Sequence, residues 1–259
     1  MKKIVLLLAF CLSIGNVFAQ DADKLRDEGD AALKAKNYAE AFTKYDGFLK
    51  QTNNEDADRV FNCAFAAFQA KKYEDAVKYY DLAIQKNKNI DDAYTGKAMA
   101  LRNLNKAAEF TATVEAGLKA KPGDADLEKL LYVYCMKQGQ AVQKSGKIAD
   151  AEELYKDVLI VSNPKYKENA LYSLGAMYYN EGAKILAAAT DPAKYEAEKD
   201  KADVQMKKAK EYMEQAVALN AANANAKKIL DSINETLAKY HPLNPHIRLY
   251  NKTRHGYTS

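Results

Sequence analysis

The amino-acid sequence predicts an all-α fold, a right-handed α-solenoid of about five helix-turn-helix repeats closed by a C-terminal capping helix. The main evidence is a short signature that recurs about every 34 residues. It reads Tyr38, Ala41, Tyr45, then Tyr73, Ala76, Tyr80, and later Ile148, Ala151, Tyr155, with Gly29, Ala64 and Gly139 each nine positions upstream. A helix pair cannot bury its apolar face alone, so units that recur at a fixed period are expected to stack on one another.

Two further observations place the repeats along the chain. Between Tyr73 and Ile84 the apolar residues are spaced by three and by one, which indicates an amphipathic helix and not a strand. Helix-stopping and helix-capping residues gather between the units, as at Asn53-Asn54 and Pro122-Gly123-Asp124. The expected repeats span 22–55, 57–90, 91–124, 125–165 and 168–222, and the capping helix spans 222–240.

The fifth repeat is longer than the others. Counted from Gly175, its second helix should carry an alanine at 187, yet the matching Ala209 lies 22 residues further on. Both sides of Thr190-Asp191-Pro192 are rich in helix-forming residues, and this tripeptide reads as a helix stop, an N-cap and a proline at the first helical position. We therefore expect two lengthened helices that form a projecting hairpin at about 181–205.

The two ends of the chain differ from the repeats. Lys2 and Lys3 precede a short apolar run, and Ala19 follows at a suitable cleavage position, which predicts a signal peptide at 1–19. An uncleaved anchor is the alternative, but the apolar run is short for about 30 Å of hydrocarbon. We expect a mature periplasmic or secreted chain without a membrane-spanning segment, ending in a flexible basic tail at 241–259.

Charge and cysteine content exclude some classes of function. The net charge is +4, but without Lys2, Lys3 and the three basic residues of the tail the body carries 34 − 35 = −1. A nearly neutral body argues against nucleic acid as a partner. Cys63 and Cys135 lie two repeats apart at core positions, beyond the reach of a disulfide, so we expect two buried free thiols.

At several positions the repeats resemble the tetratricopeptide repeat (TPR), and the resemblance covers about residues 22–240. The first half of its motif is matched by Leu171, Leu174, Gly175 and Tyr178, and a further repeat supplies Tyr94, Ala98, Leu101 and Pro122. Phe110 and Val114 depart from the pattern. The resemblance implies that small residues let the two helices of a pair approach closely, that aromatic rings fill the gaps, and that the protein is a binding scaffold.

The residues needed for most catalytic and metal sites are missing from the repeats. No histidine lies between Gln20 and Tyr240, which removes imidazole from acid–base chemistry and from zinc binding. No glycine-rich phosphate loop and no nucleophile elbow occurs. We expect a protein that is not an enzyme and that uses no cofactor and no metal.

The resemblance also implies which residues face the concave groove of the array, because this family lines it with fixed positions of the first helix in each pair. Carried over, these positions are Arg26, Asp30, Lys34; Phe61, Phe65, Phe68, Gln69; Met99, Arg102, Asn103; Met136, Gln140, Lys144; and Tyr172, Tyr179, Asn180. From them we expect partner binding by Phe61, Phe65, Phe68, Met99, Arg102, Asn103, Tyr172, Tyr179 and Asn180. The Asp30 carboxylate would repel the C-terminal carboxylate that some relatives bind.

Three explanations of the aromatic residues stay open. The phenylalanines could hold a segment of a protein partner, could be covered by the chain's own C-terminal part, or could belong in two of three cases to the core between repeats. Tyr172 and Tyr179 could instead stack on sugars of a glycan or cell wall, and Phe61 to Phe68 could mediate self-association into a homo-oligomer. A short motif, Asp231-Ser232-Ile233, resembles an O-glycosylation acceptor.

Overall fold

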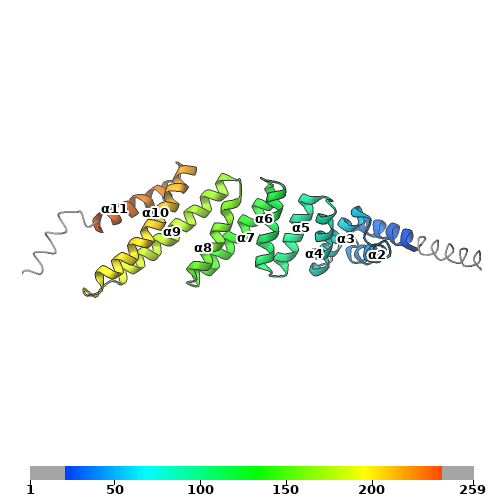
Figure 1. The fold of residues 1–259 in the computed structure, drawn as a ribbon, viewed down its shortest axis with the longest axis horizontal. Helices are drawn as coiled ribbons and strands as arrows, with labels where there is room; N and C mark the ends of the chain where they lie inside the picture. Colours follow the sequence, from blue (N-terminus) through cyan, green and yellow to red (C-terminus); the bar gives the residue numbers. More distant parts are fainter. Residues whose placement is uncertain (1–20, 241–259) are drawn as a thin grey trace, which may run out of the picture. The chain divides into compact units, whose positions relative to one another are not determined.

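The computed structural model describes residues 21–240, and within this range the regular elements are all helical, which confirms the all-α fold class (Figure 1). The chain divides into two compact units, with the boundary between Leu127 and Glu128. We describe them separately as the first and the second unit. The predicted signal peptide, 1–19, and the predicted tail, 241–259, lie outside the described residues.

The first unit is a series of helices of similar length. They are a helical segment at 21–34, α2 (Tyr38–Gln51), α3 (Ala57–Gln69), α4 (Tyr73–Gln85), α5 (Ile90–Asn103), α6 (Ala107–Ala120) and the start of α7 (Ala125–Lys144). Consecutive helices from α2 to α6 pack on one another, and α3 also contacts α5. The first helices of successive pairs, α3 and α5, are therefore neighbours in one layer.

Glycines and tyrosines explain how closely the two helices of a pair approach. A Cβ atom added to Gly29 would lie 2.8 Å from Cδ1 of Tyr45, and one added to Gly139 in the second unit would lie 2.5 Å from Cε1 of Tyr155. Such separations are too short for real atoms, so each ring occupies the space that the missing side chain leaves. The packing of small residues against aromatic rings, implied by the repeat pattern, is confirmed at these pairs.

A single left-handed residue makes the turn between the two helices of each of the first four pairs. These residues are Lys36 (φ 58°), Lys71 (φ 61°), Asn105 (φ 57°) and Gly146 (φ 80°). At the first of them, Asn37 N donates to Ala32 O and Lys36 N to Leu33 O, both at 2.9 Å. The other three turns repeat this pair of bonds, which caps the end of the first helix and reverses the chain.

The second unit contains longer helices. After α7 come α8 (Ile148–Asp157), the short 3-10 helix η1 (Val158–Ile160), α9 (Pro164–Ala188), α10 (Tyr195–Leu219) and α11 (Ala224–Tyr240). α9 and α10 have 25 residues each and lie side by side (Figure 1). The expected start of the second hairpin helix at Pro192 is wrong by three residues. Asp191 instead forms a turn, in which its side chain accepts from Ala193 N at 3.0 Å.

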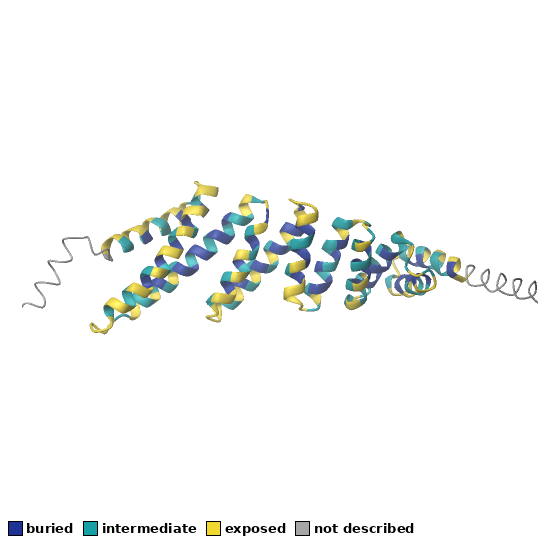
Figure 2. Cartoon of the chain, in the orientation of Figure 1, coloured by how far each residue is buried: buried dark blue, intermediate teal, exposed yellow. Residues whose placement is uncertain are grey.

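Burial is concentrated where the helices of each unit meet, and exposed residues gather at the turns (Figure 2). In the second unit methionines fill spaces beside glycines, since a Cβ on Gly175 would lie 2.8 Å from Cγ of Met213. Cys63 and Cys135 are fully buried free thiols in separate units, as expected. Burial raises the pKa of Cys63 well above its usual range and that of Cys135 to about 12.

Candidate partner-binding surface

In the first unit, α3 presents a mixed polar and aromatic face. Asp56 is the N-cap of this helix, and its carboxylate accepts a hydrogen bond from Arg59 N at 3.0 Å. Asp58, Asn62 and Phe65 then follow at intervals of four and three residues, which places them on one face. We call this face the α3 face.

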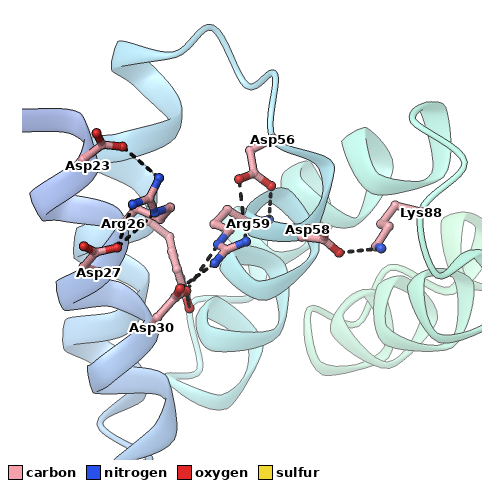
Figure 3. Close-up of polar contacts among 9 residues, drawn as sticks. Asp23, Arg26, Asp27, Asp30, Asp56, Asp58, Arg59 and Lys88 are labelled. Atoms are coloured by element: carbon pink, nitrogen blue, oxygen red, sulfur yellow. Dashed lines mark hydrogen bonds and ion pairs between the residues drawn. The ribbon is translucent and has the colours of Figure 1, made fainter. Parts of the chain in front are cut away.

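A network of charged side chains connects α3 to the helical segment at 21–34 (Figure 3). Arg59 reaches Asp30 with two nitrogens, at 3.3 Å from Nε to Oδ1 and 2.5 Å from Nη2 to Oδ2, and Tyr45 donates its hydroxyl to the same carboxylate at 2.7 Å. Burial alone would raise the pKa of Asp30, but the hydrogen bonds from Arg59 and Tyr45 outweigh it, so the pKa is lowered. Asp30 is therefore an ionised, fully engaged carboxylate.

Next to this network lies an open cleft of about 450 Å³. Its lining includes Asp58 and Asn62 of the α3 face and, on the other side, Asp30 and Lys34 of the helical segment. Asp58 is itself paired with Lys88, which lies in the loop between α4 and α5 (Figure 3). The carboxylates of the cleft are thus neutralised, and the Asn62 side chain is hydrogen-bonded to the Tyr45 hydroxyl. This leaves Lys34 and the rest of the Asn62 carboxamide as the available polar groups of the cleft.

The three phenylalanines of α3 are all half-buried, but they differ in their contacts. Phe61 and Phe68 pack against the buried core of the first unit, and their rings meet Tyr80 and Tyr73 at centroid distances of 6.0 and 5.7 Å. Phe65 instead meets Tyr38 edge-on at 5.9 Å. Two of the three rings therefore serve packing, and Phe65 is the one whose position on the α3 face suits partner binding.

The other expected residues of the first unit lie on α5, next to α3. Met99 and Arg102 are half-buried, and Asn103 is exposed at the end of the helix. The Asn103 side chain donates to Met99 O at 2.8 Å, so part of its hydrogen-bonding capacity serves its own helix. The structure therefore places these residues on a helix that neighbours α3 within one unit.

Arg26 and Asp30 take part in ion pairs that the repeat pattern does not predict. Arg26 is held by Asp23 at 2.8 Å and by Asp27 at 2.9 Å, both on its own helix. Asp30, expected to repel a carboxylate, has its charge compensated by Arg59. Sequence reasoning missed the bonds from Arg59 and Tyr45 to Asp30, because neither residue falls at a position that the repeat family assigns to the groove.

In the second unit, the expected residues lie on α9. Tyr172 and Tyr179 are half-buried and pack against the core of this unit, whereas Asn180 is exposed. Asn180 lines a cleft of about 600 Å³ together with Gln140 and Lys144 of α7. Because both rings are partly packed against this core, only part of each ring is free to stack on a sugar.

Two negative findings concern the described residues alone. Between residues 21 and 240 no group of three or more His, Cys, Asp and Glu side chains could hold a metal ion. In the same range, none of the helices combines the length and the apolar composition that crossing a bilayer requires. At the O-glycosylation-like motif, the Ser232 hydroxyl donates to Lys228 O at 3.0 Å within α11.

Comparison with known proteins gives one strong similarity. No family model matches the chain, and neither does any curated protein. The crystal structure of a TPR repeats protein from Bacteroides fragilis is 44% identical, with a TM-score of 0.76, and the match covers 83% of this chain and 98% of that one.

Two more distant structures are also similar. The P58(IPK) TPR domain is 15% identical with a TM-score of 0.42, covering 87% of this chain and 68% of that chain. The MamA protein is 15% identical with a TM-score of 0.41, covering 78% of this chain and 97% of that chain. The repeated helix pairs and the extensive match to the Bacteroides fragilis protein show that this chain belongs to the TPR repeat family.

Proposed function

We propose that the protein is a non-enzymatic scaffold whose α3 face binds a peptide or helical segment of another protein. Proteins of this repeat family are generally scaffolds for protein–protein interaction, which supports the general role. The observation that carries the specific proposal is the position of Phe65. It continues the face formed by Asp58 and Asn62, which line the cleft, while Phe61 and Phe68 pack inward.

Each part of this surface has a role that follows from its chemistry. An aromatic ring contributes a large apolar contact area at a low cost in side-chain entropy, so Phe65 is the anchor. Asn62 can donate and accept hydrogen bonds, and Lys34 supplies a positive charge at the rim. Arg102 and Asn103, on the neighbouring α5, orient the partner segment beyond the cleft.

We also propose that the scaffold works in the cell envelope, as a periplasmic or secreted protein. The support is the sequence of the first 19 residues, where a basic start precedes a short apolar run and Ala19. Amino-terminal sequencing of the chain purified from envelope fractions should find Gln20 as the first residue. A mature chain that starts at Met1 in the cytoplasm would contradict this part of the proposal.

Site-specific photocrosslinking tests the binding surface. A benzophenone amino acid placed at Phe65 should yield a discrete adduct with another protein on irradiation of cells, identified by mass spectrometry. The matched control carries the same amino acid at Ala112, an exposed position on α6, and should yield none. Adducts with carbohydrate, or with a second copy of this chain, would support the glycan-binding or self-associating alternatives instead.

A substitution separates binding from packing. Phe65→Asp should abolish capture of the crosslinked partner and leave the melting temperature within a few degrees of the wild type. Phe61→Ala is the comparison, because loss of a ring packed against the core should cost about 2–3 kcal/mol of unfolding free energy. If Phe65→Asp destabilises the chain as much as Phe61→Ala does, Phe65 belongs to the packing and the proposed anchor is wrong.

A further inference from the structure

Two tyrosine rings from successive helix pairs are stacked in the second unit. Tyr132 of α7 and Tyr166 of α9 have ring centroids 4.2 Å apart and ring planes within 10° of parallel. Both residues are half-buried, so each is partly accessible to small molecules in solution. They lie outside the α3 face and are not part of the lining of the cleft beside α9, to which Asn180 contributes.

Hydrogen bonds on both sides of this tyrosine pair hold the two helices together. One turn before Tyr132, the buried Glu128 carboxylate accepts from Asn163 N at 3.2 Å, and Asn163 is the residue that caps α9. Three residues after Tyr166, Asn169 Nδ2 donates to the hydroxyl oxygen of Tyr132 at 2.9 Å. The two rings are therefore fixed beside each other by contacts that do not depend on the rings themselves.

Two phenols held in contact can be joined by oxidation. A one-electron oxidant removes an electron from each ring, and each hydroxyl loses its proton to water. The two tyrosyl radicals then form a carbon–carbon bond between ring carbons ortho to the hydroxyls, and the hydrogen on each of these carbons moves to the oxygen, which restores both phenols. Rotation about the side-chain bonds of two partly exposed rings brings these carbons together. Because the rings are already adjacent, coupling does not require an encounter between separate molecules.

We propose that Tyr132 and Tyr166 form an oxidative crosslinking site, at which a one-electron oxidant generated from hydrogen peroxide produces dityrosine. One peroxide molecule accepts the two electrons and two protons that the pair releases and is reduced to two molecules of water. The new bond joins α7 covalently to α9, and it closes a loop in the unfolded chain as a disulfide does. This modification goes beyond the scaffold function and requires no partner protein.

A second tyrosine pair in the same unit provides an internal comparison. Tyr178 and Tyr212 are also within 10° of parallel, but their ring centroids lie 6.0 Å apart. Tyr178 is buried, its hydroxyl donates to Glu152, and the ammonium group of Lys208 lies 4.8 Å from the centre of its ring. A positive charge over a ring opposes the removal of an electron from that ring. This second pair should therefore resist coupling under conditions that crosslink the first.

Controlled oxidation of the purified full chain tests the proposal. A haem peroxidase with limiting hydrogen peroxide should produce dityrosine fluorescence in the monomer fraction, and the mass of the crosslinked chain should be lower by two hydrogen atoms. Mass spectrometry of the digested chain should find Tyr132 and Tyr166 in one crosslinked species. Tyr132→Phe and Tyr166→Phe should each lower the yield of dityrosine about tenfold, because phenylalanine keeps the ring but lacks the phenol that the oxidant attacks.

The second tyrosine pair supplies the matched control. Tyr212→Phe also removes one phenol from a stacked pair, and it should change the yield of dityrosine by less than about twofold. Before oxidation, each variant should melt within a few degrees of the wild type, because each loses only a hydroxyl group. After oxidation, the crosslinked wild type should unfold at a higher urea concentration than the untreated chain, followed by circular dichroism. Tyr132→Phe, oxidised in the same way, should show no such increase.

Three results would overturn the proposal. The first is an undiminished yield of dityrosine in Tyr132→Phe, and the second is dityrosine that joins two chains but does not form within one. The third is oxidation confined to Cys135, the buried thiol one turn after Tyr132, because the oxidising equivalent would then end on sulfur and the rings would not couple. None of these results concerns the capture of a partner by Phe65, so the scaffold function is tested independently.

Discussion

The two units hold the loops between their repeats with different interactions. In the first unit, the loops that lead into new repeats are held by partly exposed ion pairs, Lys88 with Asp58 and Lys121 with Asp91. In the second unit, buried Glu128 accepts from Ser162 N and Asn163 N, before α9. The repeat period determines where these loops occur along the chain. The local burial determines how much each ion pair or hydrogen-bonded carboxylate contributes to stability.

The packing around glycines shows a second difference, which sets the α9–α10 pair of the second unit apart from the other helices. Rigid tyrosine rings lie against Gly29 and Gly96 in the first unit and against Gly139 in the second, whereas between α9 and α10 the flexible methionines Met206 and Met213 lie against Gly182 and Gly175. A methionine has three rotatable bonds and can move away from an added atom, which an aromatic ring enclosed in a core cannot do. The glycines packed by tyrosine rings should therefore tolerate an added side-chain atom less well than the glycines between α9 and α10.

The largest expected effect is the protection of the two buried thiols from alkylation, which shows whether the two units unfold separately. Cys63 reports on the first unit and Cys135 on the second, and both should be alkylated at least a thousandfold more slowly in the native chain than in urea. Pulsed alkylation at increasing urea, read by mass spectrometry of the two peptides, should give two distinct midpoints. Coincident midpoints would mean that the two units unfold as one.

Substitution of glycine should separate the two kinds of packing. A Cβ at Gly96 would overlap the Tyr80 ring, so Gly96→Ala should cost about 2–3 kcal/mol of unfolding free energy. At Gly182 the nearest atoms belong to Met206, at 2.9 Å from Cε, and Gly182→Ala should cost less than about 1 kcal/mol. Urea denaturation followed by circular dichroism measures both, and equal losses would remove the distinction.

Removal of a buried carboxylate should cost more than removal of an exposed one. Glu128→Ala leaves two backbone N–H groups before α9 without their acceptor, and should cost about 2 kcal/mol. Asp91→Ala removes a partly exposed ion pair with Lys121 and should cost at most about 1 kcal/mol. Denaturation midpoints at low and high salt give a further check, because only the Asp91 contribution should shrink with salt.

The smallest effect is a pH dependence that originates in the first unit. The pKa of Asp30 is lowered in the folded chain, so its stabilisation is complete above the ordinary value of 3.8 and disappears as pH falls through the lower folded value. Asp30→Asn should therefore melt at a temperature less sensitive to acid below about pH 4 than the wild type. Identical acid sensitivity of the two chains would exclude Asp30 as a contributor.

The periodic parts of the fold could be predicted from sequence, and the non-periodic contacts could not. Gly29 with Tyr45 and Gly139 with Tyr155 could be paired in advance, because their spacing repeats and each contact lies within one helix pair. Arg59 could not be paired with Asp30, because this contact occurs once and depends on side-chain geometry between two pairs. The same limit explains why Phe61, Phe65 and Phe68 looked equivalent: spacing places them on one helix, and only packing separates them.

The left-handed turn residues are positions where a substitution can raise the thermal stability of the chain. At Lys36 and Lys71 the backbone adopts a conformation that costs a lysine about 1 kcal/mol and that glycine accepts freely. Gly146 already occupies the equivalent turn in the second unit. Exchanging the two lysines for glycine should raise the melting temperature of the chain without altering α3 or the cleft beside α9. Variants of these surfaces that lose stability could then be made in a more stable chain.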